Sequence, residues 1–274
     1  MNTASATTAR AKNSRTMQVL GRAGMVCYGV VHLLVAYLAL RVAFGDAAQQ
    51  ADQKGAIQQI GSTGFGGVLL WVLGIGLLAF ALWQFLMAAK GFGWVPKQGK
   101  RTRKRIGAAA RGVIGVALGV TSIAYVTGSG SSGGSGNEQQ RTWTATVLAW
   151  PAGPFLVGAV ALVIVGVAIG IAARGVRASF VHDLDMTDLP AGTQQWVRRL
   201  GVFGYIAKGV TLGIIGVLIG FAALNHDPKE AGGLDAALKT LAGQPFGTVA
   251  LTVVAIGLAA YGVYCFAAAK AQRR

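Results

Sequence analysis

Six long apolar stretches, separated by shorter polar segments, dominate the pattern of the chain. Each is long enough to cross the roughly 30 Å hydrocarbon core of a bilayer as a helix of about 20 residues. Apolar and small residues lie on all faces of these helices, unlike the single stripe of a soluble helix, and no stretch alternates apolar with polar residues as a barrel strand does. The pattern predicts membrane-spanning helices near 24–43, 66–88, 107–127, 152–173, 203–224 and 247–268.

A two-helix pattern occurs three times along the chain. The motif Leu-Gly-x-x-Gly-x-x-x-x-Gly-Val begins at Leu20 and again at Leu200, and a middle copy keeps its core, Gly-x-x-x-x-Gly-Val, from Gly107. Because each copy holds an even number of spans, all three copies enter the membrane in the same direction. The repeats therefore predict an all-α polytopic membrane protein, with six transmembrane helices as three parallel two-helix repeats and approximate pseudo-three-fold symmetry about the membrane normal.

The second helix of each copy is expected to open at a phenylalanine, with a glycine eleven residues later. The phenylalanines are Phe65, Phe155 and Phe246, and the glycines are Gly76, Gly166 and Gly257. Short apolar segments before the phenylalanines predict brief interfacial helices at 56–60, 146–150 and 236–241. The predicted division is a basic tail (1–21), three repeats (22–91, 107–173 and 200–274), a basic loop (92–106), a Gly/Ser outer linker (128–136) and a second loop (174–199).

The charges give the predicted helices a direction. Twenty of the 25 Lys and Arg residues lie in the N-terminal tail, after the second and fourth spans, or at the C-terminus and the adjoining helix ends. Six of the nine acids lie in the other three loops. The excess of Lys and Arg on one side predicts that both termini face the cytoplasm. Lys208 and Arg111 fall close to that side, where their side chains are expected to snorkel to water.

Composition supports a membrane protein and bears on its partners. Only 12% of the residues are charged and 53% are hydrophobic, against about 25% charged in soluble proteins, which excludes a disordered chain. A net charge of +16 is compatible with nucleic-acid binding. However, no aromatic residues that could stack on bases interleave with the densest basic run, so no nucleic-acid partner is expected. We expect that run to contact anionic lipid head groups on the cytoplasmic side, through Lys100, Arg101, Arg103, Lys104 and Arg105.

Glycines four residues apart are expected to pack the helices together. A missing side chain lets two backbones approach and gain dispersion contacts in lipid. A glycine-lined path for a substrate is the alternative. The predicted packing pairs are Gly115 and Gly119, Gly166 and Gly170, Gly209 and Gly213, and Gly216 and Gly220.

Few polar side chains inside the spans could carry chemistry. His32 and Gln84 form the possible intramembrane polar site. Either residue could bond to a neighbouring helix, relay protons or hold a ligand. The acids lie outside the predicted spans, which argues against a proton- or sodium-coupled carrier. The outer carboxylate Asp52 lies in a different loop from Asp227 and Asp235, and the three show no visible pairing for acid–base work.

The sequence contains no motif that indicates an enzyme. The three histidines lack a second His or Cys at ligand spacing, and no nucleophile elbow, phosphate-binding loop or dinucleotide fingerprint occurs. We therefore expect no metal, no cofactor and no catalytic residues.

The repeated motif is accompanied by two further segments, Phe180-x-x-x-Leu184 and Trp196-Val197-Arg198-Arg199-Leu200-Gly201. Through the repeated motif and these two segments, the chain resembles the actinobacterial membrane family called domain of unknown function 1206. The resemblance covers residues from about 18 to the C-terminus. It implies six spans and a plasma-membrane location, but it does not indicate any activity.

Two hypotheses for function follow. The first is a non-enzymatic membrane scaffold or accessory subunit with a membrane-protein partner, and the alternative is a channel or transporter for a small solute, ion or lipid.

Overall fold

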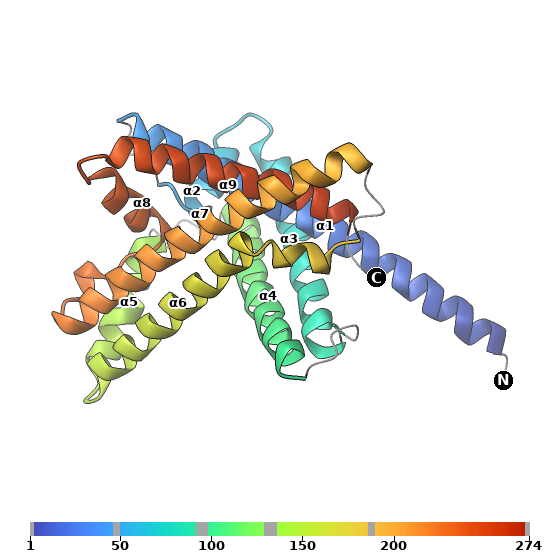
Figure 1. Cartoon of the computed structure of the whole chain (residues 1–274), viewed down its shortest axis with the longest axis horizontal. Helices are drawn as coiled ribbons and strands as arrows, with labels where there is room; N and C mark the ends of the chain where they lie inside the picture. Colours follow the sequence, from blue (N-terminus) through green and yellow to red (C-terminus); the bar gives the residue numbers. More distant parts are fainter. Residues whose placement is uncertain are drawn as a thin grey trace. The chain divides into compact units, whose positions relative to one another are not determined.

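The computed structural model describes residues 3–45, 50–90, 92, 98–128, 136–185 and 190–271. The described elements are helical (Figure 1). In chain order they are α1 (Thr3–Ala43), α2 (Gln53–Gly61), α3 (Gly66–Lys90), α4 (Gln98–Val126), α5 (Gly136–Leu148), α6 (Gly153–Val176), the 3-10 helix η1 (Ser179–Asp183), α7 (Ala191–Leu224), the 3-10 helix η3 (Pro228–Glu230), α8 (Leu234–Ala242) and α9 (Gly247–Lys270).

Six described helices, α1, α3, α4, α6, α7 and α9, are long and apolar enough to span a membrane. They confirm the six predicted spans and the all-helical class. Three of them begin well before the apolar residues do. α1 starts at Thr3, whereas its apolar span starts at Gly21. α4 starts at Gln98, so the basic run is helical from that residue onward, and α7 starts at Ala191 rather than near 203. The Gly/Ser linker expected at 128–136 lies mostly outside the described residues.

The chain forms two compact units, which are described separately. Unit 1 comprises Met1–Tyr28 and Ile60–Gly130, and unit 2 comprises Gly29–Gln59 and Ser131–Arg274. In unit 1, α3 packs along α4. In unit 2, α7 packs along α6 on one side and α9 on the other (Figure 1).

Each repeat has the order long helix, short helix, long helix. The short helices α2 and α8 confirm the brief helices predicted at 56–60 and 236–241, whereas α5 lies earlier than the helix predicted at 146–150 and ends at Leu148. A glycine starts each second long helix, and its N–H donates to the carbonyl three residues back: Gly66 to Thr63 (2.8 Å), Gly153 to Trp150 (2.8 Å) and Gly247 to Gln244 (2.7 Å). A Cβ at any of these glycines would collide with carbonyl oxygens at the end of the short helix. The tight joint therefore requires glycine.

This joint corrects the predicted start of one helix. α3 and α9 begin directly after Phe65 and Phe246, as expected, but α6 begins at Gly153, before Phe155. Proline follows Gly153 in the first turn of α6, where its missing N–H and its fixed φ are tolerated. The joint thus depends on glycine, and Phe155 lies inside the helix.

Small residues lie where the second long helix of one repeat meets the first long helix of another. In unit 1, a Cβ at Gly115 of α4 would lie 3.1 Å from the Ala81 Cβ of α3. In unit 2, a Cβ at Gly209 would lie 3.0 Å from the Ala168 carbonyl oxygen. A Cβ at Gly29 of α1 would lie 2.8 Å from the carbonyl oxygen of Gly262 in α9. Missing side chains thus bring backbones together, as expected for helices in lipid.

The other glycines of the predicted packing pairs differ in how closely they are packed. A Cβ at Gly119 would lie 2.9 Å from Leu78, and one at Gly216 would lie 2.8 Å from Val165. Gly213 and Gly220 make only ordinary van der Waals contact, at 3.8 Å.

The pair Gly166 and Gly170 does not pack helices in the part of the chain that the structure describes. A Cβ at either glycine would meet nothing within 4 Å. The face of α6 toward α7 instead carries alanines such as Ala161 and Ala168. Spacing alone places two glycines on one helix face but does not say which face a neighbour covers. The three-fold arrangement about a membrane-normal axis stays a prediction.

Candidate functional site

Four aromatic rings of unit 2 pack together where α6, η1, α7 and α9 approach one another. We call Phe180, Tyr205, Tyr261 and Tyr264 the aromatic cluster. Phe180 stacks on Tyr205, with ring centroids 5.0 Å apart, and meets Tyr264 edge-on at 5.2 Å. Tyr205 also meets Tyr261 edge-on at 5.3 Å. These are the favoured geometries of aromatic pairs, each worth about 1 kcal/mol beyond simple burial.

Two glycines and one unusual turn make room for the cluster. A Cβ at Gly201 would collide with the Phe180 ring, and one at Gly175 would lie 2.9 Å from the Tyr205 Cβ. Ala178 has a left-handed backbone conformation, with φ of 47°, at the start of η1. This conformation is uncommon for a residue with a Cβ. The turn changes the direction of the chain after α6, and Phe180, two residues later, is fully buried within unit 2.

Two cations lie against the cluster. The Arg174 guanidinium pairs with the Asp183 carboxylate and lies over the Tyr205 ring, 5.3 Å from its centroid. The Lys208 ammonium lies 4.4 Å from the centroid of Tyr261. A cation over an aromatic face is stabilised by about 0.5–2 kcal/mol, more as water is excluded. The aromatic cluster therefore holds two positive charges inside unit 2.

The position of Lys208 differs from the sequence-based expectation. Because α7 begins at Ala191, Lys208 lies in the middle of the helix rather than at its end. Its side chain contacts Tyr261, which supplies a partner within the protein. The equivalent place in unit 1 holds an aromatic pair, since Tyr28 stacks on Phe80 with centroids 5.1 Å apart.

His32 joins the same cluster. Its side chain is only 6% exposed, and its ring lies 4.8 Å from that of Tyr261 at an angle of 51°. This contact fits a packed histidine on a neighbouring helix. Gln84 is also buried, but it belongs to α3 in unit 1. The two residues of the predicted polar site therefore do not form one site within either unit.

A second polar group joins the short helices α5 and α8 to the segment just before α2 in unit 2. We call Asp235, Asn137 and the Ala51 N–H the short-helix polar cluster. The Asp235 carboxylate accepts the Ala51 N–H at 2.9 Å and the Asn137 side-chain amide at 2.9 Å. It also pairs with Lys239, at 3.1 Å. The Asn137 side-chain oxygen Oδ1 accepts the Gly233 N–H at 2.9 Å. One buried carboxylate thus connects segments of all three repeats.

The sequence shows no pairing of the outer carboxylates for acid–base work, and in the structure Asp52 and Asp235 accept hydrogen bonds from backbone N–H groups. Asp52 accepts the Gly55 N–H at 2.8 Å at the start of α2 and is 4% exposed. Burial raises the pKa of the Asp52 carboxyl, and the negative charge of Asp235 raises it further, against the lowering effect of the Gly55 hydrogen bond. Asp227, by contrast, caps only its own turn, by accepting the Lys229 N–H.

The raised pKa of Asp52 predicts an unusual pH dependence of stability. Between its ordinary value and the raised value, the folded state binds more protons than the unfolded chain, so the free energy of unfolding falls as pH rises through this interval. We expect Asp52→Asn to remove this contribution and to be at least as stable as the wild type at pH 7. Thermal unfolding in detergent between pH 4 and 7 measures the difference. Asp227→Asn is the control, and an Asp52→Asn variant with the wild-type pH slope would contradict the assignment.

The predicted lipid-contact residues lie on the first turns of α4. Lys100 and Arg103 are exposed, whereas Arg101, Lys104 and Arg105 are partly buried. The Lys104 ammonium lies 5.8 Å from the centroid of the Phe92 ring. The five cations thus belong to one helical segment rather than to a loop. Among the described residues, no three His, Cys, Asp or Glu side chains are grouped as a metal site requires.

Sequence reasoning missed the aromatic cluster and the short-helix polar cluster. Tyr261 and Tyr264 are three residues apart, as are Tyr205 and Lys208, and this spacing places each pair on one helix face. That signal was available in the sequence. The contact between Asp235 and Asn137 had no such signal, because 98 residues separate them.

Comparison with known proteins places these features in a family context. The family model described as Domain of Unknown Function (DUF1206) matches residues 23–91, 106–178 and 203–272, one match for each two-helix repeat. A Bacillus subtilis (strain 168) protein called "Uncharacterized protein YxxB" is 32% identical over 244 residues, which cover 89% of this chain and 87% of that protein. The similarity therefore extends beyond the actinobacteria. No solved structure matches the chain.

Proposed function

The chain belongs to the family described as Domain of Unknown Function (DUF1206), and from that premise we propose that it is a non-enzymatic membrane scaffold or accessory subunit. It is a multi-pass membrane protein with six candidate spans. The family description names no activity, so the proposal depends on how this chain uses its own polar residues.

The observation that carries the proposal is the internal use of polar side chains within the spans. The Ser122 hydroxyl donates to the Leu118 carbonyl at 2.9 Å, and the Thr211 hydroxyl donates to the Ala207 carbonyl at 2.8 Å. Both bonds stay within one helix, and His32 packs on a ring. A pathway for ions or solutes needs polar groups that face water. Groups engaged inside the protein support a packing role instead.

The proposed location is the plasma membrane, with both termini in the cytoplasm. The basic helix ends, which include α4 from Gln98 and α7 up to Arg199, favour this orientation. A membrane-impermeant thiol reagent tests it in intact cells. His226→Cys, at an exposed site beyond α7, should react, whereas Arg103→Cys should react only after the cells are permeabilised. The reverse pattern would overturn the orientation.

The basic start of α4 is the proposed contact with anionic head groups on the cytoplasmic side. Lys or Arg near an anionic surface contributes about 1 kcal/mol each. Lys100 and Arg103 are exposed there. This segment would hold the scaffold at the level of the head groups without forming a defined pocket.

A partner test distinguishes a scaffold from a transporter. A photo-crosslinking residue at Ile169 of α6, which is 65% exposed, should give one discrete, stoichiometric product in native membranes. The same residue at the neighbouring Ala168, which is 3% exposed, is the matched control and should give none. Repeated recovery of the protein alone, or a solute flux in liposomes that His32→Ala abolishes, would overturn the scaffold proposal.

A further inference from the structure

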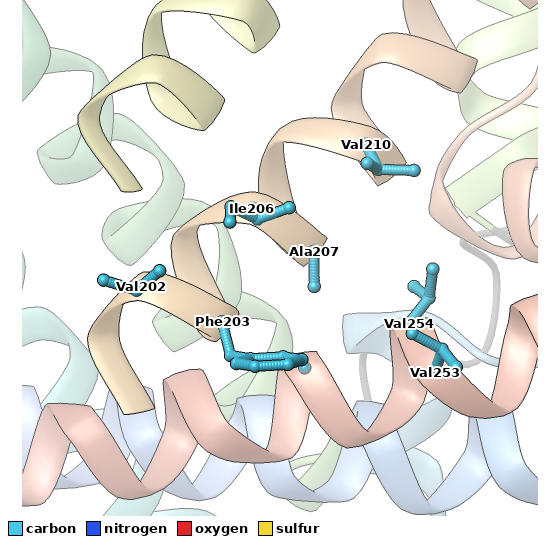
Figure 2. A pocket seen from close by; sticks show the side chains of 8 residues that line it. Val202, Phe203, Ile206, Ala207, Val210, Val253 and Val254 are labelled. Carbon is cyan, nitrogen blue, oxygen red and sulfur yellow. The ribbon is translucent and has the colours of Figure 1, made fainter. Parts of the chain in front are cut away.

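An apolar groove of about 150 Å³ runs between α7 and α9 in unit 2. Its walls are formed by five residues of α7 and three of α9: Val202, Phe203, Ile206, Ala207 and Val210, and Val253, Val254 and Gly257. Figure 2 shows Phe203 and Ala207 pointing from α7 toward α9, and Val254 pointing back toward α7. Phe203 and Val253 are more than half exposed, so the groove opens outward rather than into the packed interior.

A cation and an indole extend the groove toward the start of α7. Trp196, Arg199 and Phe203 are spaced by three and four residues, which places them on one face of the helix. The Arg199 guanidinium lies 5.7 Å from the centroid of the Trp196 ring, and the Trp196 side chain is 63% exposed. Neither α7 nor α9 contains an aspartate or glutamate. The groove therefore has an apolar body and a positively charged end.

The length of this surface fits one leaflet of a bilayer. From Arg199 to Val210 the helix rises about 17 Å at 1.5 Å per residue, and one leaflet of the hydrocarbon core is about 15 Å thick. Tryptophan prefers the membrane interface, so Trp196 marks the level of the head groups. Arg199 then lies at the level of a phosphate, with the groove extending toward the bilayer centre.

We propose that this surface binds one anionic phospholipid. The Arg199 guanidinium pairs with the phosphate, for which its planar fork is suited, and an acyl chain lies along Phe203, Val210 and Val253. A helix with side chains is about 10 Å wide and does not fit a groove of about 150 Å³. The site is made by α7 and α9 of unit 2 and uses none of the basic residues of α4, and it serves a scaffold or a transporter equally.

Native mass spectrometry of the full chain in detergent tests the site. Dioleoyl-phosphatidylglycerol should bind more tightly than dioleoyl-phosphatidylcholine. We expect Arg199→Gln to weaken the binding of the anionic lipid about fivefold, which corresponds to one basic contact. Arg198→Gln is the matched control, because it removes the same charge from an exposed neighbour that the helical period turns to another face, and it should change binding less than twofold.

A second pair of variants tests the contribution of the apolar groove separately from that of the Arg199 charge. Val253→Phe should fill the groove and weaken binding of the anionic lipid about threefold through lost dispersion contacts. Val249→Phe, at an exposed position outside the lining, should not. The proposal would be overturned if the two lipids bound equally, or if Arg198→Gln and Arg199→Gln had equal effects. It would also be overturned if Val253→Phe left lipid binding unchanged, or if glycerol 3-phosphate alone displaced the lipid at similar concentration.

Discussion

Asp235→Ala is expected to lower the free energy of unfolding of unit 2 by about 3 kcal/mol. The change removes the acceptor of the Ala51 N–H and of the Asn137 amide, and it leaves Lys239 without its carboxylate. A buried donor that loses its partner costs about 1–3 kcal/mol in desolvation. The loss affects α5, α8 and the segment before α2 together, because Asp235 contacts a segment of each repeat.

Thermal unfolding in detergent, followed by circular dichroism, measures this effect. The expected decrease in Tm is about 6–12 °C for a chain of this size. Asp227→Ala is the matched control, since Asp227 caps only a local turn and its loss should cost about 1 kcal/mol or less. Asp235→Asn keeps the shape and one acceptor oxygen, and we expect it to fall between the two. An Asp235→Ala variant as stable as Asp227→Ala would contradict the role of the short-helix polar cluster.

The spans and short helices could be predicted from the sequence because their signals are local. A run of apolar residues such as 247–268 specifies a span by its own length, whatever it packs against. The same holds for α8, whose leucines and alanines recur at helical spacing within nine residues. The start of α6 was misplaced because Phe155 resembles Phe65 and Phe246 in type, whereas the joint depends on glycine.

The candidate site could be predicted only in part, because its contacts join distant segments. His32 was identified by its residue type inside a span. Its partner Tyr261 lies on the last helix, and no pattern within one sequence pairs the two. The same limit applies to Ala51 and Asp235, which are 184 residues apart. The glycine spacing predicted close packing at Gly209 and Gly216 of α7 and in α4, but not the open surroundings of Gly166 and Gly170 in α6.

Gly204→Ala is expected to destabilise the packing of α7 on α9 by about 3 kcal/mol, near the upper end for overpacked cores. A Cβ at Gly204 would lie 2.6 Å from the Tyr261 Cα and 2.8 Å from its backbone nitrogen. No side-chain rotation relieves a contact with backbone, so the helices must separate. Unit 1 repeats the arrangement, since a Cβ at Gly24 would lie 2.5 Å from the Phe80 Cα.

Gly213→Ala in the same helix is the matched control for Gly204→Ala. Its new Cβ would lie 3.8 Å from Ala168, an ordinary contact, and alanine favours a helix over glycine by up to about 1 kcal/mol. We therefore expect Tm in detergent to fall by about 6–12 °C for Gly204→Ala and to stay level or rise for Gly213→Ala. Because Gly204 adjoins Tyr205, separation of α7 from α9 should also expose the aromatic cluster and increase quenching of its tyrosine fluorescence. Equal stability of the two variants would show that α7 and α9 are not in backbone contact at Gly204.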